Sequence, residues 1–302
     1  MLNKILYTTL GISLALIFFP HPAKEAVKTP VVAGISTQAA DNALKTAPEM
    51  AVNLSQPQLT ARAALAYDLD SGTVLYSNNL DEKLPIASLT KLMTALTVVN
   101  HVGPNAVVTI IKADETPIGS TVGLVEGEKI TVSDLLAAML IPSGNDAALA
   151  LANFVAGTPE KFAEMMNQEA TDLNLANTHF SNPVGWDTFD SQANFSNSLD
   201  LIKIVQEFLK HDELRKIVGT RQASVSSLDG KYVHQLLTTN KLLLDDPEVT
   251  GIKTGFTSKA MGNLIILDNH GGNQIVTVVL GSDNREADTQ KLLDWVFAVY
   301  KW

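Results

Sequence analysis

The sequence predicts an α+β fold in which an antiparallel sheet is flanked by helices and the middle of the chain forms a helical lobe. Three observations predict it. Strand-like segments lie both before and after a helical middle region, the two strand groups can complete one sheet, and a helical segment ends the chain. A sheet beside a separate lobe also favours a cleft between the two.

The 302 residues have the composition of a globular protein. Hydrophobic residues make up 46% of the chain and charged residues 18%, which excludes a chain that is disordered throughout and a coiled-coil rod. The formal net charge of −10 disfavours nucleic acid as a partner, because nucleic-acid-binding proteins usually carry positive charge. The lack of cysteine excludes disulfides, thiol catalysis and cysteine-bound metals.

Residues 1–22 are predicted to be a signal peptide or an N-terminal anchor. Lys4 precedes an apolar stretch from Ile5 to Phe19, which is shorter than the ~20 residues that a spanning helix needs and fits the ~7–15 residues of a signal-peptide core. Ala23 follows at a poor cleavage site, so an uncleaved anchor remains an alternative, whereas the unpatterned flanks argue against a buried core helix. We therefore expect export.

Residues 23–60 are expected to form a linker, and residues 61–302 the folded domain. The linker is rich in Ala, Thr, Pro and Gln and has no sustained hydrophobic period. The domain begins with two predicted strands, 63–68 and 73–76, on either side of a turn at 70–72, which is typical of a hairpin.

Hydrophobic periodicity predicts five helices in the middle of the domain. In the first of them, Leu89, Leu92 and Leu96 recur at the i, i+3, i+7 spacing of one helix face. The five predicted helices cover 88–99, 132–139, 146–155, 159–173 and 199–209. Thr158 and Ser198 are the expected N-caps of the last two.

Strands follow the helical region, and a helix closes the domain. The predicted strands cover 223–226, 249–254, 263–267 and 275–280. Gly271 and Gly272 are typical of a hairpin turn between the last two strands, and the final helix is expected from about 287 to 302.

Ser88 and Lys91 lie three residues apart at the start of the first predicted helix, where their side chains share one face. A serine hydroxyl becomes a nucleophile when a neighbouring amine accepts its proton, provided that burial and neighbours lower the lysine pKa. The helix N-terminus also offers free backbone N–H groups to a developing oxyanion. The alternative is that Ser88 is an N-cap and Lys91 a surface residue.

Ser143, Gly144 and Asn145 follow Pro142 and precede a predicted helix, which places these side chains on a tight turn between helices. A serine on such a turn can relay a proton, and an asparagine amide can both donate and accept hydrogen bonds. The alternative is an ordinary turn in which Asn145 is an N-cap.

Lys253, Thr254 and Gly255 lie in an apolar predicted strand. The lysine could attract a substrate carboxylate, and the glycine allows another backbone to lie close to the strand. The alternative is a solvated lysine beside a bulge.

The three motifs are far more specific together than each is alone. Their order, S-x-x-K, S-x-N and K-T-G, is the signature of β-lactamases and penicillin-binding proteins. From about residue 61 to residue 302, the chain resembles the serine-type D-Ala-D-Ala carboxypeptidases, the low-molecular-weight penicillin-binding proteins of peptidase family S11. The segments that carry the resemblance are 85–94, 143–148, 177–180, 182–185 and 251–255. The resemblance implies a β-lactamase/transpeptidase-like fold.

The resemblance also assigns catalytic roles to the first two motifs. Ser88 is the acyl-ester nucleophile, and Lys91 is the general base that activates it. Ser143 and Asn145 belong to the proton network and hold the substrate amide. The oxyanion hole consists of the backbone N–H groups of Ser88 and Phe256.

The third motif is assigned to substrate binding on the same grounds. Lys253, with the backbone of Thr254 and Gly255, binds the peptide as an added strand. Arg285 is the nearest match to the basic residue that often binds the terminal carboxylate in this family. Many relatives add a second β-rich domain and a C-terminal anchor. The sequence shows neither, so we expect any membrane attachment to come from the N-terminal segment.

The function predicted is that of a serine D-alanyl-D-alanine carboxypeptidase that trims the terminal D-Ala of peptidoglycan stem peptides in the periplasm or another extracytoplasmic cell-wall space. β-Lactam antibiotics are the expected inhibitors. We expect no cofactor and no metal, because no two of the six histidines have metal-ligand spacing. A DD-endopeptidase that cleaves peptidoglycan cross-links remains open, since the sequence does not show the width of the cleft.

Two other functions are weaker alternatives. A class A β-lactamase uses a Glu in a loop between the second and third motifs, whereas the acidic segment 169–174 lies in a predicted helix. Gly144 also stands where lactamases have Asp. A non-catalytic peptidoglycan-binding protein has no need for the complete set of motif residues.

Overall fold

The computed structural model describes residues 46–114, 119–187 and 193–302. The predicted signal peptide or anchor at 1–22 and the first part of the predicted linker lie outside the described residues. Among the described residues, no helix is both long and apolar enough to cross a bilayer.

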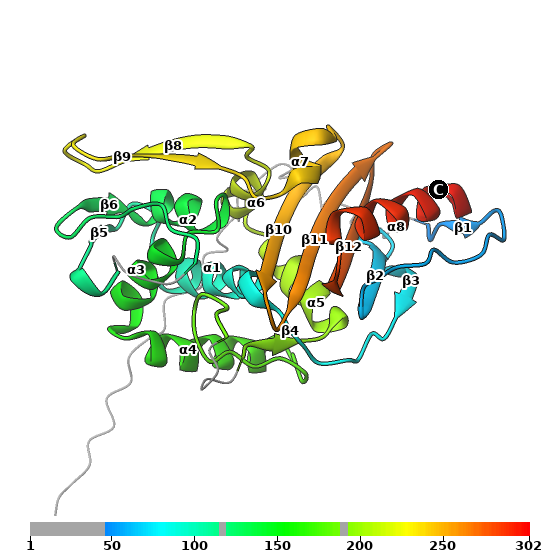
Figure 1. Cartoon of the computed structure of the whole chain (residues 1–302), viewed down its shortest axis with the longest axis horizontal. Coiled ribbons are helices and arrows are strands. Elements are labelled where there is room, and N and C mark those ends of the chain that lie inside the picture. Colours follow the sequence, from blue (N-terminus) through cyan, green and yellow to red (C-terminus); the bar gives the residue numbers. More distant parts are fainter. Residues whose placement is uncertain (1–45, 115–118, 188–192) are drawn as a thin grey trace, which may run out of the picture. The chain divides into compact units, whose positions relative to one another are not determined.

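Five strands form one antiparallel sheet in the order β10-β11-β12-β2-β3 (Figure 1). The strands are β2 (Ala63–Asp68), β3 (Thr73–Asn78), β10 (Val249–Thr257), β11 (Met261–His270) and β12 (Asn273–Ser282). Strand β12 pairs with β2, with Val278 opposite Leu65, so strands from both ends of the domain meet in the middle of the sheet. The two predicted hairpins, with turns at 70–72 and 271–272, are confirmed.

Alternate side chains of a strand point to opposite faces of the sheet, and each face packs into a buried core of its own. Leu65 and Val278 belong to the core shared with the helical lobe. Ala64 and Val279 belong to a second core on the other face, which is covered by α8 (Arg285–Val299). The sheet is therefore the middle layer between the helical lobe and the last helix.

The middle of the chain forms the helical lobe, as predicted. Its helices are α1 (Thr90–His101), α2 (Val132–Leu140), α3 (Asn145–Ala156), α4 (Pro159–Asp172), α5 (Ser198–Phe208) and α6 (Asp212–Val218). The first five follow the predicted ranges closely. The sequence pattern does not predict α6, because seven residues are too few to show a clear hydrophobic period.

Side chains cap α4 and α5 at their N-termini. The Thr158 hydroxyl accepts a hydrogen bond from the N–H of Lys161, as predicted. The prediction that Ser198 caps α5 is wrong, because Ser198 is already helical. Asn197 holds the cap position, and its side-chain oxygen accepts the N–H of Asp200 at 2.8 Å.

The last helix ends earlier than predicted. Helix α8 stops at Val299, and Tyr300–Lys301 form β13, which pairs with β1 (Glu49–Met50). The prediction of a helix as far as residue 302 is therefore wrong beyond residue 299. The extended backbone lets the Tyr300 hydroxyl donate to the carbonyl oxygen of Leu75 at 2.8 Å, so tertiary contacts outweigh the local helical pattern.

The described end of the predicted linker is held against the folded domain by backbone pairing and hydrogen bonds. Besides the pairing of β1 with β13, the Thr60 hydroxyl donates to Asp288 of α8 at 2.6 Å. The backbone N–H groups of Thr60 and Ala61 donate to the same carboxylate. A domain boundary at residue 61 stays a prediction.

Several short elements complete the described chain. They are η1 (Ala87–Leu89), η2 (Lys112–Asp114), α7 (Lys241–Asp245), β4 (Leu84–Pro85) with β7 (Phe195–Ser196), β5 (Val107–Thr109) with β6 (Lys129–Thr131), and β8 (Gln222–Ser226) with β9 (Val233–Leu237). Of these, only β8 is predicted as a separate element. The hairpin of β8 and β9 extends from the helical side of the molecule (Figure 1).

Candidate active site

Ser88 and Lys91 lie side by side where η1 leads into α1. The Lys91 Nζ is 2.9 Å from Ser88 Oγ, 2.7 Å from Asn145 Oδ1 and 2.8 Å from the carbonyl oxygen of Val184. Lys91 is fully buried, so the alternative of a surface lysine is wrong.

The surroundings of Lys91 favour a neutral amine. Burial and the positive charge of Lys253 lower the pKa of Lys91 well below its usual value, and the opposing effect of Asp146 is outweighed. A neutral amine has two N–H groups and one lone pair. When its N–H groups bind the two neighbouring carbonyl-type oxygens, its lone pair faces the Ser88 hydroxyl and can accept that proton.

The second motif occupies the turn between α2 and α3. Ser143 has a φ of +67°, which few residues other than glycine adopt, and Gly144 is the N-cap residue of α3. A Cβ on Gly144 would lie 2.7 Å from the carbonyl oxygen of Ala138, so a side chain does not fit there. Asn145 is already helical and its side-chain oxygen accepts from Lys91, so the alternative in which Asn145 is only an N-cap is wrong.

The third motif brings a second buried lysine to the site. Lys253 in β10 is 1% exposed, so the alternative of a solvated lysine is wrong. Its Nζ donates to Ser143 Oγ at 2.9 Å and to the carbonyl oxygen of Thr254 at 3.0 Å. Burial and the charge of Arg285 lower the pKa of Lys253 to about 7. Each motif serine is thus bonded to one buried lysine.

Gly255 lies against the turn that carries Ser88. A Cβ at this position would lie 2.9 Å from the carbonyl oxygen of Ile86 and 3.2 Å from Ser88 N. The close approach of another backbone that the sequence predicts is therefore present. The neighbouring Thr254 hydroxyl is 2.6 Å from that of Thr239, a contact that holds the strand beside Ser88.

A cleft of about 790 Å³ is lined by both β10 and the helical lobe, as the sequence predicts. Most of the predicted site residues line it, namely Ser88, Ser143, Asn145, Thr254, Gly255, Phe256 and Arg285. Lys91 and Lys253 complete the group through their bonds to Ser88 and Ser143. The Phe256 side chain is 65% exposed, so an aromatic ring borders the cleft at the end of the third motif.

Arg285 is the first residue of α8 and lines the same cleft. Its Nη1 donates to the carbonyl oxygen of Gly255 at 2.9 Å, and its Nε donates to Glu286 at 3.0 Å. These two bonds fix the guanidinium group beside the third motif. An arginine held in this way can bind a carboxylate with its remaining N–H groups.

The family model described as D-alanyl-D-alanine carboxypeptidase, peptidase S11, matches residues 50–284. The chain belongs to peptidase family S11.

Relatives in family S11 are similar over most of the chain. D-alanyl-D-alanine carboxypeptidase DacF of Bacillus subtilis is 33% identical over 250 residues, which cover 80% of this chain and 63% of DacF. DacC of Escherichia coli is 34% identical over 261 residues, covering 81% of this chain and 63% of DacC. A D-alanyl-D-alanine carboxypeptidase of Streptomyces sp. K15 is 31% identical over 268 residues, covering 82% and 91%. The chain thus spans less than two thirds of DacF and DacC.

Solved structures share the fold of this S11 chain. The Streptomyces K15 DD-transpeptidase aligns with a TM-score of 0.74 at 32% identity, over 82% of this chain and 100% of that one. A D-alanyl-D-alanine carboxypeptidase of Mycobacterium tuberculosis aligns with a TM-score of 0.76 at 28% identity, over 83% and 96%. The predicted β-lactamase/transpeptidase-like α+β fold is therefore confirmed.

One contact of Lys91 is not predicted from the sequence. The carbonyl oxygen of Val184 accepts a hydrogen bond from Lys91. The next residue, Gly185, has a φ of +83°, and a Cβ on it would lie 1.9 Å from the carbonyl oxygen of Ala87. The Asn182 side-chain oxygen accepts three backbone N–H groups of this loop. The N-P-V-G segment is visible in the sequence, but the position of a backbone carbonyl is not.

Proposed function

We propose that this S11 chain is a serine D-alanyl-D-alanine carboxypeptidase, which trims the terminal D-Ala of peptidoglycan stem peptides through an acyl-enzyme. The observation that carries the proposal is the pair of Lys91 and Ser88. A buried lysine with a lowered pKa, 2.9 Å from a serine hydroxyl that lines a cleft, is what general-base activation of a serine needs.

In the proposed acylation, Ser88 Oγ attacks the penultimate D-Ala carbonyl while its proton passes to Lys91 Nζ. The C–N bond then breaks, and the leaving D-alanine amine takes up a proton. We assign delivery of that proton to Ser143, which takes up one from Lys253 through their hydrogen bond. Lys91 passes on the proton taken from Ser88 and Lys253 regains one, so both lysines return to their starting states before deacylation. The backbone N–H groups of Ser88 and Phe256 are the proposed oxyanion hole. Water then hydrolyses the ester and restores the serine.

The substrate is proposed to bind as an extended peptide along the free edge of β10. This strand is the last in the sheet, so only its other edge is paired, with β11. Thr254 and Gly255 offer backbone hydrogen bonds to the peptide, and Asn145 offers its amide to the substrate amide. Arg285 binds the free terminal carboxylate that marks a carboxypeptidase substrate.

The proposal includes the location and the inhibitors. Residues 1–22 direct the chain to the periplasm or another extracytoplasmic cell-wall space, as a cleaved signal peptide or as a retained anchor. β-Lactams present a strained amide to the same serine and acylate it. No part of the proposed chemistry uses nucleic acid.

Two measurements on the purified protein test this function. The wild type should be labelled covalently by a fluorescent penicillin on a denaturing gel, and Ser88→Ala should not, whereas Ser224→Ala on β8 should be labelled normally. A peptide ending in D-Ala-D-Ala should release D-alanine, with little turnover of nitrocefin. A label on Ser88→Ala would place the nucleophile elsewhere. Cleavage of cross-linked muropeptides without D-alanine release would favour the endopeptidase, and rapid nitrocefin turnover a β-lactamase.

A further inference from the structure

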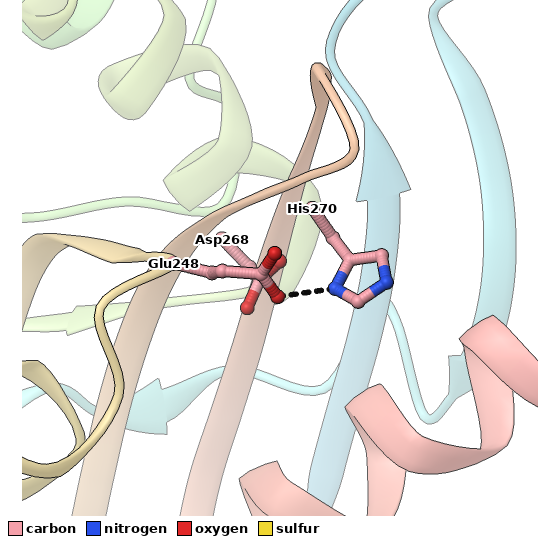
Figure 2. A group of neighbouring side chains, drawn as sticks. All are labelled: Glu248, Asp268 and His270. Atoms are coloured by element: carbon pink, nitrogen blue, oxygen red, sulfur yellow. Dashed lines mark hydrogen bonds and ion pairs between the residues drawn. The ribbon is translucent and has the colours of Figure 1, made fainter.

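Two carboxylates and an imidazole come together where β10 begins and β11 ends (Figure 2). Asp268 and His270 are two residues apart on β11, so their side chains lie on the same face of the sheet. Glu248 immediately precedes β10, whose first residue, Val249, pairs with Asp268. One ligand atom from each of the three side chains lies within 4.8 Å of the other two. None of the three lines the cleft.

Asp268 is the unusual member of this group. It is 2% exposed, and its Oδ1 has no hydrogen-bond partner among the described residues. Two other buried aspartates of the described chain, Asp146 and Asp288, accept several hydrogen bonds each. Asp146 accepts from the backbone N–H groups of the 122–124 segment, and Asp288 accepts from Thr60, Ala61 and Ser282. A cation placed beside this carboxylate oxygen would supply the partner that the described residues do not.

His270 and Glu248 form the solvent side of the group. The Nδ1 of His270 and a carboxylate oxygen of Glu248 are bonded to each other, as the dashed line in Figure 2 marks. The imidazole stacks on Phe297 of α8, with ring centres 4.3 Å apart. The two side chains are 51% and 42% exposed, which gives a solvated ion access to the buried Asp268.

Two hydrogen bonds also hold the backbone of Glu248. Its N–H donates to the side chain of Asp246 at 2.8 Å, and its carbonyl oxygen accepts the N–H of Asn269 at 2.9 Å. The carboxylate of Asp246 adds a further negative charge near the group. A preformed backbone on both strands lowers the cost of bringing the three ligand atoms around one ion.

We propose that Glu248, Asp268 and His270 bind one divalent metal ion of the zinc class, contrary to the expectation of no metal from histidine spacing, because this ligand set comes from two segments and contains a single histidine. One imidazole nitrogen and two carboxylate oxygens are the mixed ligand set that Zn²⁺ accepts, with water in the remaining position. Bonds of about 2.1 Å require ligand atoms closer together than 4.8 Å, and rotation of the two exposed side chains provides the closure. His270 then gives up its bond to Glu248 and binds the ion through the Nδ1 lone pair, with its ring proton on Nε2.

The proposed ion has a structural role. It joins the residue before β10 to the last residues of β11, and it neutralises the buried charge of Asp268, whose Oδ1 has no hydrogen-bond donor among the described residues. Strand β10 carries Lys253, Thr254 and Gly255, so the ion stabilises the start of the strand that forms one wall of the cleft. It takes no part in the proposed acylation.

Calorimetric titration of the chelator-treated full chain with Zn²⁺ tests the proposal. We expect one saturable site per chain, with Mg²⁺ and Ca²⁺ much weaker, and a melting temperature about 5 °C or more higher at a hundredfold excess over Kd. His270→Gln and Glu248→Gln, at half-exposed positions, should weaken Zn²⁺ binding about tenfold or more. Asp268→Asn should do the same and should not lower the melting temperature of the metal-free protein.

Two matched variants complete the experiment. Asp245→Asn removes an exposed neighbouring charge, and His101→Gln removes an exposed histidine on α1, and both should bind Zn²⁺ as the wild type does. Lack of saturable binding in the wild type up to ~1 mM Zn²⁺ would overturn the proposal. Undiminished binding by His270→Gln and Glu248→Gln would overturn it too, even if Asp268→Asn does not fold.

Discussion

The side-chain amines of Lys91 and Lys253 are buried away from water. None of their hydrogen-bond partners among the described residues is a carboxylate. Lys91 bonds to a hydroxyl, an amide oxygen and a backbone carbonyl, and Lys253 to a hydroxyl and a backbone carbonyl. Such partners orient an amine but do not replace the hydration of an ammonium ion, so both pKa values fall. An amine of this kind can accept a proton near neutral pH.

Replacing Lys91 by alanine should slow acylation of Ser88 by about 10²–10⁴-fold, the usual contribution of a general base. In the wild type, acylation should fall as the pH drops, because protonation removes the lone pair. Since the pKa of Lys91 is lowered, this decline should lie well below pH 10.5. Stopped-flow labelling with a fluorescent penicillin across pH measures both effects. Lys291→Ala, exposed on α8, should acylate normally, and a Lys91→Ala rate within about tenfold of wild type would contradict the base role.

Arg285 should matter only to substrates with a free terminal carboxylate. Arg285→Ala should lower kcat/KM for a peptide ending in D-Ala-D-Ala. The corresponding loss of transition-state stabilisation should be about 1.5–3 kcal/mol, the range for a hydrogen bond to a charged group. The same peptide with an amidated terminus should be nearly unaffected. Measuring both peptides with both enzymes gives a double-mutant cycle. Additive losses would mean that Arg285 does not bind that carboxylate, and would favour the endopeptidase.

Elements with a long hydrophobic period follow the sequence prediction, and elements fixed by tertiary contacts do not. Helices α1 to α5 each span several turns, whereas α6 and α7 have only seven and five residues. The residues of the site also fall into those that the sequence predicts and those that it does not. Ser88, Lys91 and Lys253 are recognisable from motif spacing. The Val184 carbonyl and the unpaired oxygen of Asp268 result from segments that meet only in the folded chain.

Gly185→Ala tests how tightly the loop of Val184 is packed against η1. The new Cβ would lie 1.9 Å from the carbonyl oxygen of Ala87 at a φ of +83°. Strain and overpacking together should lower the free energy of unfolding by about 2–5 kcal/mol. Gly157→Ala is the matched control, because its φ is +81° and no atom lies within 4 Å, so it should cost about 1 kcal/mol. Urea unfolding measures the free energy of unfolding of both variants. Equal decreases in the two would show that the backbone shifts to relieve the contact with Ala87.

At the level of the whole molecule, one carboxylate ties the beginning of the domain to its last helix. Asp288 of α8 accepts hydrogen bonds from Ser282, from the hydroxyl and N–H of Thr60, and from the N–H of Ala61. Burial by itself would raise the pKa of Asp288, but these hydrogen bonds outweigh it and hold the pKa below the usual 3.8. Ionised Asp288 therefore stabilises the fold.

Asp288→Asn should lower the free energy of unfolding by about 1–3 kcal/mol at neutral pH. Because the folded pKa lies below 3.8, the contribution is complete above that pH and is lost as the pH falls through the folded value. Urea unfolding should thus give a constant difference between wild type and variant from about pH 5 to 8, and a smaller one below about pH 4. Asp294→Asn, exposed on α8, should show neither effect. A difference that grows on acidification would contradict this assignment.

The pairing of β2 with β12 also sets the order in which a newly made chain can fold. Leu65 is translated long before its partner Val278, and the hairpin of β2 and β3 alone is marginally stable in water. The intervening helices can collapse from local contacts, whereas closing the sheet waits for the last strands and is correspondingly slow. Lys253 joins the cleft only at that step. A partly folded chain therefore holds Ser88 and Lys91 without a complete site, and covalent labelling of Ser88 would report finished folding as well as chemistry.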